Sequence, residues 1–196
     1  MLVALSAPVL LAAGADRDLV RQLDNEVIAL RQRIQLLEQH CGNDQAPPAF
    51  FAQLVQVYAG TPVQVDRQGA RAVLTIRVDD LFSKDSVTVR EEAQPWLDLL
   101  ATSLGVNATT NVMVVGYSDG SPAPGPMRAL YPSIWQWSEA QANAVSEQLI
   151  RRYGVQPGRI TLATRGIWDP VASNDTPEGR ALNRRVAVYL FEGRFP

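Results

Sequence analysis

Residues 174–186 read NDTPEGRALNRRV, a polar run that leads directly into the apolar segment 186–191. That segment has the short length and the branched and aromatic side chains of a buried β-strand. Segments 112–117 and 160–164 have the same character, and a stretch with helical periodicity precedes each of them. The sequence therefore predicts strands that alternate with helices and end in a final strand at residues 186–191.

The two main helices are predicted at residues 90–104 and 138–153, the second with Ser138 as its N-cap. Further upstream, segments 63–66 and 72–78 alternate apolar and polar residues on either side of a turn. That alternation is typical of a β-hairpin. Two helices packed over one mixed sheet are the economical arrangement of these elements, so we expect an α+β fold.

The domain is expected to begin near residue 50 with a short helix at residues 50–58. Before it, residues 42–49 read GNDQAPPA, and Pro47 and Pro48 end any helix that precedes them. We therefore interpret residues 42–49 as a linker and residues 50–196 as the globular domain.

Four motifs resemble the OmpA/MotB-like domain family. Residues 81–86, LFSKDS, are similar to the family's LFxxGS segment, with Asp85 where glycine is usual. Residues 116–119, GYSD, resemble the GHTD element, and residues 132–138, PSIWQWS, resemble the PSNWELS run of the MotB branch. Residues 174–186 are similar to NxTxEGRAxNRRV. The motifs occur in the family's order, which makes the resemblance specific.

The resemblance covers about residues 50–192 and implies a two-layer sandwich. Its sheet is mixed, in the order β-α-β-α-β-β, with the helices on one face. It also implies a ligand, the diaminopimelate of the peptidoglycan stem peptide, which is a small zwitterion. Asp119 matches the aspartate of GHTD, whose carboxylate takes the ligand's ammonium group through a charge-assisted hydrogen bond.

Other site residues are also implied by the resemblance. The family's carboxylate-binding arginine lies three residues after the serine that matches Ser138, and Gln141 stands there in this chain. Glutamine can donate a hydrogen bond but supplies neither the charge nor the fork of a guanidinium. Arg184 and Arg185 remain, and either one is a candidate to line the groove while the other pairs within the fold.

Two functions are therefore open. The first is a non-covalent peptidoglycan-binding module that anchors a dimeric envelope protein. The second is a structural or interaction protein of an envelope complex that keeps the fold but has lost the ligand. Gln141 favours the second, as does Ile134, which replaces the asparagine of PSNW; Asp119 and the motif at 174–186 favour the first.

Neither catalysis nor a cofactor is indicated by the sequence. No nucleophile–base pair is visible, and a single histidine and a single cysteine, His40 and Cys41, cannot make a metal cluster. The net charge of −2, without a basic stripe, argues against nucleic acid as a partner. We predict a binding protein with no cofactor and no metal.

The apolar start of the sequence predicts export. Residues 2–15, LVALSAPVLLAAGA, carry no charge but fall short of the roughly 20 residues of a membrane-spanning helix. Residues 1–15 are interpreted as a signal peptide or as a truncated membrane anchor; a buried helix of the domain is the alternative. A signal peptide and a membrane anchor would each place the rest of the chain in the periplasm or cell envelope of a Gram-negative-type bacterium. The stretch lacks the acidic residue that a flagellar stator subunit needs.

Residues 16–41 are predicted to form a coiled coil. Apolar side chains recur at spacings of three and four, with β-branched residues at a and leucine at d, which favours two parallel strands. Cys41 continues the register at the next a position, where a disulfide is plausible in an oxidising compartment. The alternative is a helix packed on its own domain. The dimer contacts are expected at Val20, Leu23, Val27, Leu30, Ile34 and Leu37.

We expect residues 17–41 to hold two chains in parallel, so that the two copies of Cys41 meet across the axis. Oxidised protein should then give a dimer band in non-reducing electrophoresis, and Cys41→Ser should lose the band but remain a dimer in sedimentation. A chain that sediments as a monomer at micromolar concentration and gives no band would contradict this prediction.

Overall fold

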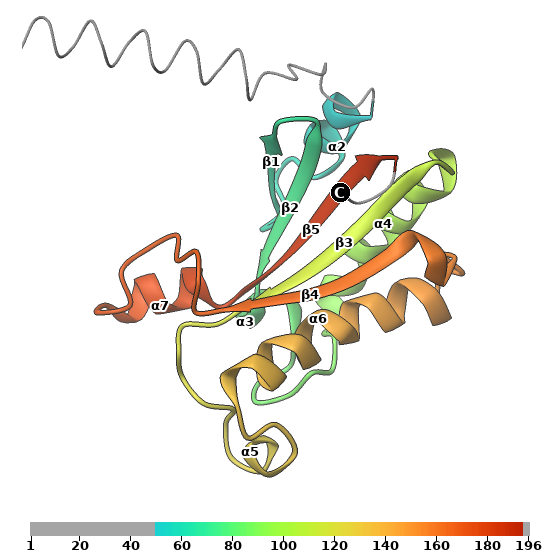
Figure 1. The fold of residues 1–196 in the computed structure, drawn as a ribbon. Helices are drawn as coiled ribbons and strands as arrows, with labels where there is room; N and C mark the ends of the chain where they lie inside the picture. Colours follow the sequence, from blue (N-terminus) through green and yellow to red (C-terminus); the bar gives the residue numbers. More distant parts are fainter. Residues whose placement is uncertain (1–49, 194–196) are drawn as a thin grey trace, which may run out of the picture. The chain divides into compact units, whose positions relative to one another are not determined.

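The computed structural model describes residues 50–193, which form a five-stranded mixed sheet with helices packed on it (Figure 1). The strand order is β1-β2-β5-β3-β4, and all neighbours are antiparallel except β3 and β4, which are parallel. The strands are β1 Gln64–Gln68, β2 Arg71–Arg77, β3 Thr110–Tyr117, β4 Ile160–Gly166 and β5 Arg185–Glu192.

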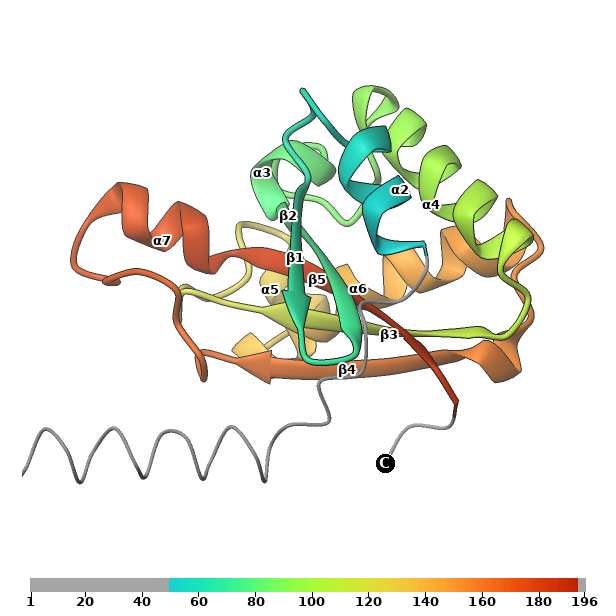
Figure 2. The same cartoon turned by 90° about the horizontal axis from the view of Figure 1, so that it is seen from above.

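Three helices pack on one face of the sheet and share its main core. They are α2 Phe51–Val57, α4 Gln94–Val106 and α6 Ile134–Arg151. The shorter elements are α3 Val78–Leu81, α5 Met127–Leu130, α7 Pro177–Asn183 and the 3₁₀ turns η1 Glu91–Ala93 and η2 Pro157–Arg159. In both views α7 lies beyond the end of the strands, away from α4 (Figure 2).

Side chains alternate between the two faces along each central strand, as the strand period of two requires. On β3, Val112 and Val114 enter the core beneath the helices, whereas Val115 and Tyr117 belong to a small cluster on the opposite face. The same alternation on β5 places Val188 in the core. The helix-covered face thus holds most of the buried apolar surface.

The predicted α+β fold is confirmed, including the antiparallel hairpin β1–β2. The expected β-α-β-α-β-β order runs from β2 to β5, and β1 adds an edge strand. The sequence did not predict α5 or α7. The predicted start of the second main helix was wrong: α6 begins one turn earlier, because Ser133 accepts from the Gln136 backbone N–H at 3.1 Å while the Gln136 side chain accepts from the Ser133 N–H.

Several predictions fall on residues 1–49, which lie outside the described part of the chain together with residues 194–196. The signal peptide or anchor at 1–15, the coiled coil at 16–41, the linker at 42–49 and the Cys41 cross-link therefore stay predictions. Within residues 50–193, no helix combines the length and the apolar character needed to cross a bilayer.

The first turns of α6 approach β3 more closely than a side chain on Gly116 would allow. A Cβ atom added there would meet the backbone carbonyl oxygen of Ser138 well inside van der Waals contact. The hydroxyls of Ser138 and Thr164 lie 2.6 Å apart, and Thr164 also donates to the Gly116 carbonyl at 3.2 Å. This contact fixes α6 against both β3 and β4.

Replacing Gly116 by alanine should therefore force α6 away from the sheet. We expect Gly116→Ala to destabilise the fold by about 1–3 kcal/mol, seen as a lower urea midpoint. Gly105→Ala is the matched control, because a Cβ atom on that residue of α4 meets open space. The free energy of unfolding of Gly105→Ala should rise by up to about 1 kcal/mol, because alanine has the higher helix propensity. Equal midpoints for the two variants would argue against the close-contact constraint.

Candidate functional site

An open pocket of about 380 Å³ lies where α3, α6 and the residue before β5 meet. Its volume is within the range of small-ligand sites. The walls carry both signs of charge together with buried aromatic and amide groups. The lining residues are Val78, Asp79, Phe82, Ser83, Lys84, Asp85, Ser86, Arg90, Pro124, Trp137, Gln141 and Arg184.

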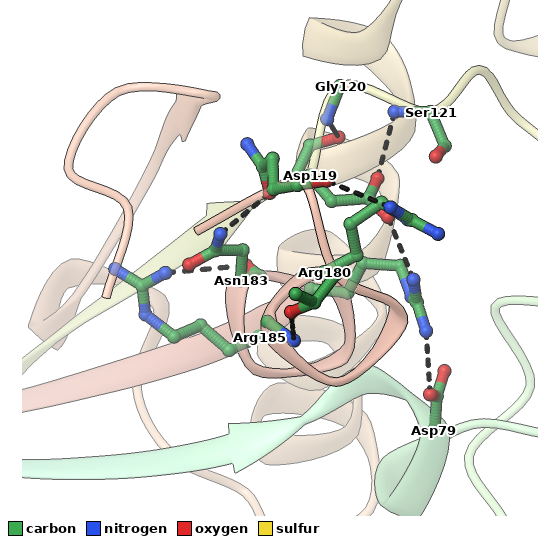
Figure 3. Close-up of polar contacts among 12 residues, drawn as sticks. Asp79, Asp119, Gly120, Ser121, Arg180, Asn183 and Arg185 are labelled. Atoms are coloured by element: carbon green, nitrogen blue, oxygen red, sulfur yellow. Dashed lines mark hydrogen bonds and ion pairs between the residues drawn. The ribbon is translucent and has the colours of Figure 1, made fainter. Parts of the chain in front are cut away.

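Arg184, which lines this pocket, bridges two aspartates: Asp79, which also lines it, and Asp119, which lies behind Arg184 and is not part of the lining (Figure 3). Its Nη1 donates to Asp119 Oδ2 and its Nη2 to Asp79 Oδ2, both at 2.8 Å. The Asp119 side chain is only 1% exposed, and its other oxygen accepts from the Ser121 N–H at 2.8 Å. Asp79 is 53% exposed. Asp119 is therefore a fully satisfied buried carboxylate, whereas Asp79 faces solvent.

The charge of Arg184 is secured by this arrangement. Burial lowers the pKa of the guanidinium, but the hydrogen bonds to Asp79 and Asp119 outweigh it, so the pKa is raised above its ordinary value. Charge-assisted hydrogen bonds of this length are the strong ones in proteins. The three residues come from α3, from the loop after β3 and from the link between α7 and β5, so the bridge ties three separate segments together.

Gln141 is almost completely buried on α6, at 2% exposure, yet it lines the pocket. Across residues 50–193, no protein group forms a hydrogen bond with its amide. The amide atoms nevertheless keep contact with the pocket space, because Thr110 Oγ1 is the one fully buried polar side-chain atom of residues 50–193 that lacks a partner. The Gln141 side chain is thus a polar group directed at the pocket with its hydrogen-bonding capacity unused.

Arg185 lies away from this pocket, although it neighbours Arg184 in the chain. Its guanidinium carbon is 3.8 Å from the centre of the Tyr117 ring, and Nη2 donates to the Asp169 carbonyl at 2.8 Å. Burial lowers its pKa. The alternation along β5 sends its side chain to the face without helices, so Arg184 is the arginine at the groove and Arg185 holds the fold.

Ser138 also does not line the pocket. It is completely buried, and its hydroxyl donates to the Ile134 carbonyl at 2.9 Å besides contacting Thr164. Its effect on the pocket is indirect, because it fixes the turn of α6 that carries Gln141. Trp137 on the same turn is 7% exposed, lines the pocket and packs against Tyr131 with ring centres 5.6 Å apart.

Most of the motif at residues 174–186 builds a loop rather than a binding site. The buried Asn183 side chain accepts from the N–H groups of Val171 and Ala172 and donates to Asn174 Oδ1 at 2.7 Å. Thr176 caps α7 by accepting from the Gly179 N–H. Arg184 alone reaches the pocket from this motif.

Asp79 is a pocket residue that the sequence did not reveal. Asp79 lies just before the LFSKDS segment at residues 81–86, which is the one sequence feature that could have pointed to it. An acidic residue at that place is not part of the motif. No three His, Cys, Asp or Glu side chains of residues 50–193 gather so as to hold a metal ion. The arrangement suits a small ligand that carries charges of both signs.

Comparisons with known proteins show which family the chain resembles. The model of the OmpA family matches residues 81–184. Outer membrane porin F of Pseudomonas aeruginosa is 35% identical over 131 residues, which make up 65% of this chain and 35% of the porin. The chain thus spans little more than a third of that relative's length.

Solved structures agree with the fold. The cell wall anchor of the T6SS from Pseudomonas aeruginosa is 38% identical, with a TM-score of 0.61, and the match covers 74% of this chain and 95% of that one. A MotB-like protein from Desulfovibrio vulgaris is 21% identical with a TM-score of 0.66, covering 74% of this chain and 90% of its own. The latter match shows a shared fold.

Removing the bridge should leave a buried charge without a partner. We expect Arg184→Met to destabilise the domain by about 3 kcal/mol, because Asp119 is then buried and unpaired. Arg165→Met is the control, since its partner Asp169 is exposed and such surface pairs contribute under about 1 kcal/mol. Adding Asp119→Asn to Arg184→Met should recover much of the loss. If the double variant unfolds at the same urea concentration as Arg184→Met, the buried charge is not the cause.

Proposed function

This chain belongs to the OmpA family, and on that basis we propose that its folded domain binds peptidoglycan and anchors the protein non-covalently to the cell wall. The protein would then reside in the cell envelope, with the domain on the side where the wall lies. Its role is binding, because the pocket presents charges and an amide but no paired nucleophile and base.

The observation that carries the proposal is the unpartnered Gln141 amide in a pocket of mixed charge. A stem-peptide diaminopimelate bears ammonium and carboxylate groups, so it can use both signs of charge and the amide. The pocket lies at the family's motifs, between residues 81–86 and the α6 turn that follows Ser133. The likeness to a cell wall anchor at 38% identity supports the same role.

In this proposal Asp119 accepts the ligand's ammonium group and Gln141 donates to its carboxylate. In the free protein the Arg184 guanidinium is hydrogen-bonded to both Asp119 and Asp79. The ligand's ammonium group therefore has to displace this guanidinium from Asp119. Ser138 acts by positioning Gln141 on α6. Arg185 acts from the opposite face by holding the fold. The competition with Arg184 and the missing arginine at position 141 both predict weak binding at a single site.

Pairing of two chains through residues 16–41 would offset that weakness. Two pockets on one dimer can engage neighbouring stem peptides of the same polymer, and the second contact forms at a high effective concentration. A weak pocket can therefore still hold a dimer at the wall.

A second candidate is an interaction protein that has lost the ligand and holds another envelope protein. The observation in its favour is that both Asp119 oxygens are already satisfied within the protein. Because the Ser121 N–H and the Arg184 guanidinium already hydrogen-bond to Asp119, its burial is explained without a ligand. Binding to purified peptidoglycan distinguishes the two candidates.

Restoring the arginine that the family carries should strengthen binding. We expect Gln141→Arg to pull down more purified sacculi than the parent chain, by roughly tenfold to a hundredfold in affinity, because a charged hydrogen bond is gained. Gln141→Met, similar in length but without a donor, is the matched control and should bind less than the parent. Adding Asp119→Ala should remove the gain.

If Gln141→Arg folds normally and neither it nor the parent binds sacculi, the wall-binding proposal fails. The pocket is then better explained as a surface for another protein.

A further inference from the structure

Two of the three cations that line the pocket are already engaged by protein groups. Arg184 is held between two aspartates, and Arg90 pairs with Glu92 at 3.4 Å. Lys84 is exposed and, among residues 50–193, has neither an acidic partner nor a hydrogen bond. Lys84 is therefore the positive charge at the pocket that is available to an anionic group.

The segment that carries Lys84 is held firmly against the pocket. The Ser83 N–H donates to the Thr88 carbonyl at 2.9 Å, and the Ser86 hydroxyl bonds with both the backbone and the side chain of Thr88. Asp85 closes the turn with a φ of 55°, in the left-handed region that aspartate tolerates better than most residues. The backbone at Lys84 is thus positioned, and only its side chain has to be ordered on binding.

Gln141 provides the second, independent observation. Its side chain reaches the same pocket from α6, the residue is only 2% exposed, and the amide has no hydrogen-bond partner within residues 50–193 although it keeps contact with the pocket space. A carboxylate has several lone pairs, so it can accept from an amide and from an ammonium group at once. A ligand carboxylate is the simplest group that satisfies both side chains.

Building on the function proposed above, we propose that Lys84 and Gln141 together bind the carboxylate of the ligand's amino-acid head. The positive charge that the family resemblance expects on α6 is supplied in this chain by the segment after α3. Lys84 is then the residue that selects a free carboxylate over its amidated form. Because Lys84 is exposed, this selection weakens as salt is added.

Lys84 is the only lysine of the chain, which allows a direct test. Reductive methylation with ¹³C-formaldehyde labels Lys84 and the terminal amine, giving separate NMR signals in the full chain. The probe is a stem tripeptide ending in diaminopimelate, with the same tripeptide amidated at its free diaminopimelate carboxylates as comparison. We expect the free acid to shift the Lys84 signal and the amidated peptide to leave it unchanged.

Affinity measurements on unlabelled protein complete the test. Lys84→Met should bind the free acid about tenfold more weakly than the parent, with a smaller salt dependence, and Lys84→Arg should stay near the parent. Both variants should bind the amidated peptide like the parent. Moving the charge back to α6, in the double variant Lys84→Met/Gln141→Arg, should restore binding of the free acid.

The outcomes separate this inference from the proposed function. If the parent binds sacculi and the tripeptide but Lys84→Met binds both equally well, Lys84 has no part in recognition and the inference is overturned. If the parent binds neither sacculi nor the tripeptide, the proposed function fails and takes the inference with it. A tenfold loss confined to the free acid supports both.

Discussion

The close approach of α6 to β3 at Gly116 is the constraint on which the pocket depends. A glycine there lets the Ser138 carbonyl lie against the strand, and the hydroxyls of Ser138 and Thr164 complete the contact. One turn further along α6, Gln141 then enters the pocket wall. Three residues after Gly116 in the chain, Asp119 enters the bridge with Arg184. One backbone contact thus positions groups on two sides of the site.

A second constraint is the alternation of side chains at the start of β5. Two adjacent arginines are separated by it into different environments: Arg184 between carboxylates at the pocket, and Arg185 over the Tyr117 ring on the other face. Neither can replace the other, because a one-residue shift of the strand would exchange the faces of every side chain on it. The loop held by Asn183 precedes both residues and fixes that register.

Periodicity and turn residues were enough to predict the hairpin β1–β2, the main helices and the central strands, because each has a local pattern. The start of α6 was predicted at the wrong serine because Ser133 and Ser138 both precede helical residues. Only the capping contact with Gln136 distinguishes them. Asp79 could not be identified from the sequence, because its place at the pocket depends on Arg184, which is 105 residues away. Long-range ion pairs leave no local pattern.

The residues that carry the family resemblance and the residues that would choose a ligand are largely different. Gly116, Thr176, Gly179 and Asn183 serve close contacts, caps and buried hydrogen bonds, so changing them costs stability. The Gln141 side chain makes no hydrogen bond within the described domain, and Lys84 is exposed, so neither side chain contributes a polar contact to the fold. The motifs therefore identify the fold reliably. In the proposed function, specificity would depend on a few pocket positions, and the positive charge can stand on α6 or on the segment after α3 while the fold stays the same.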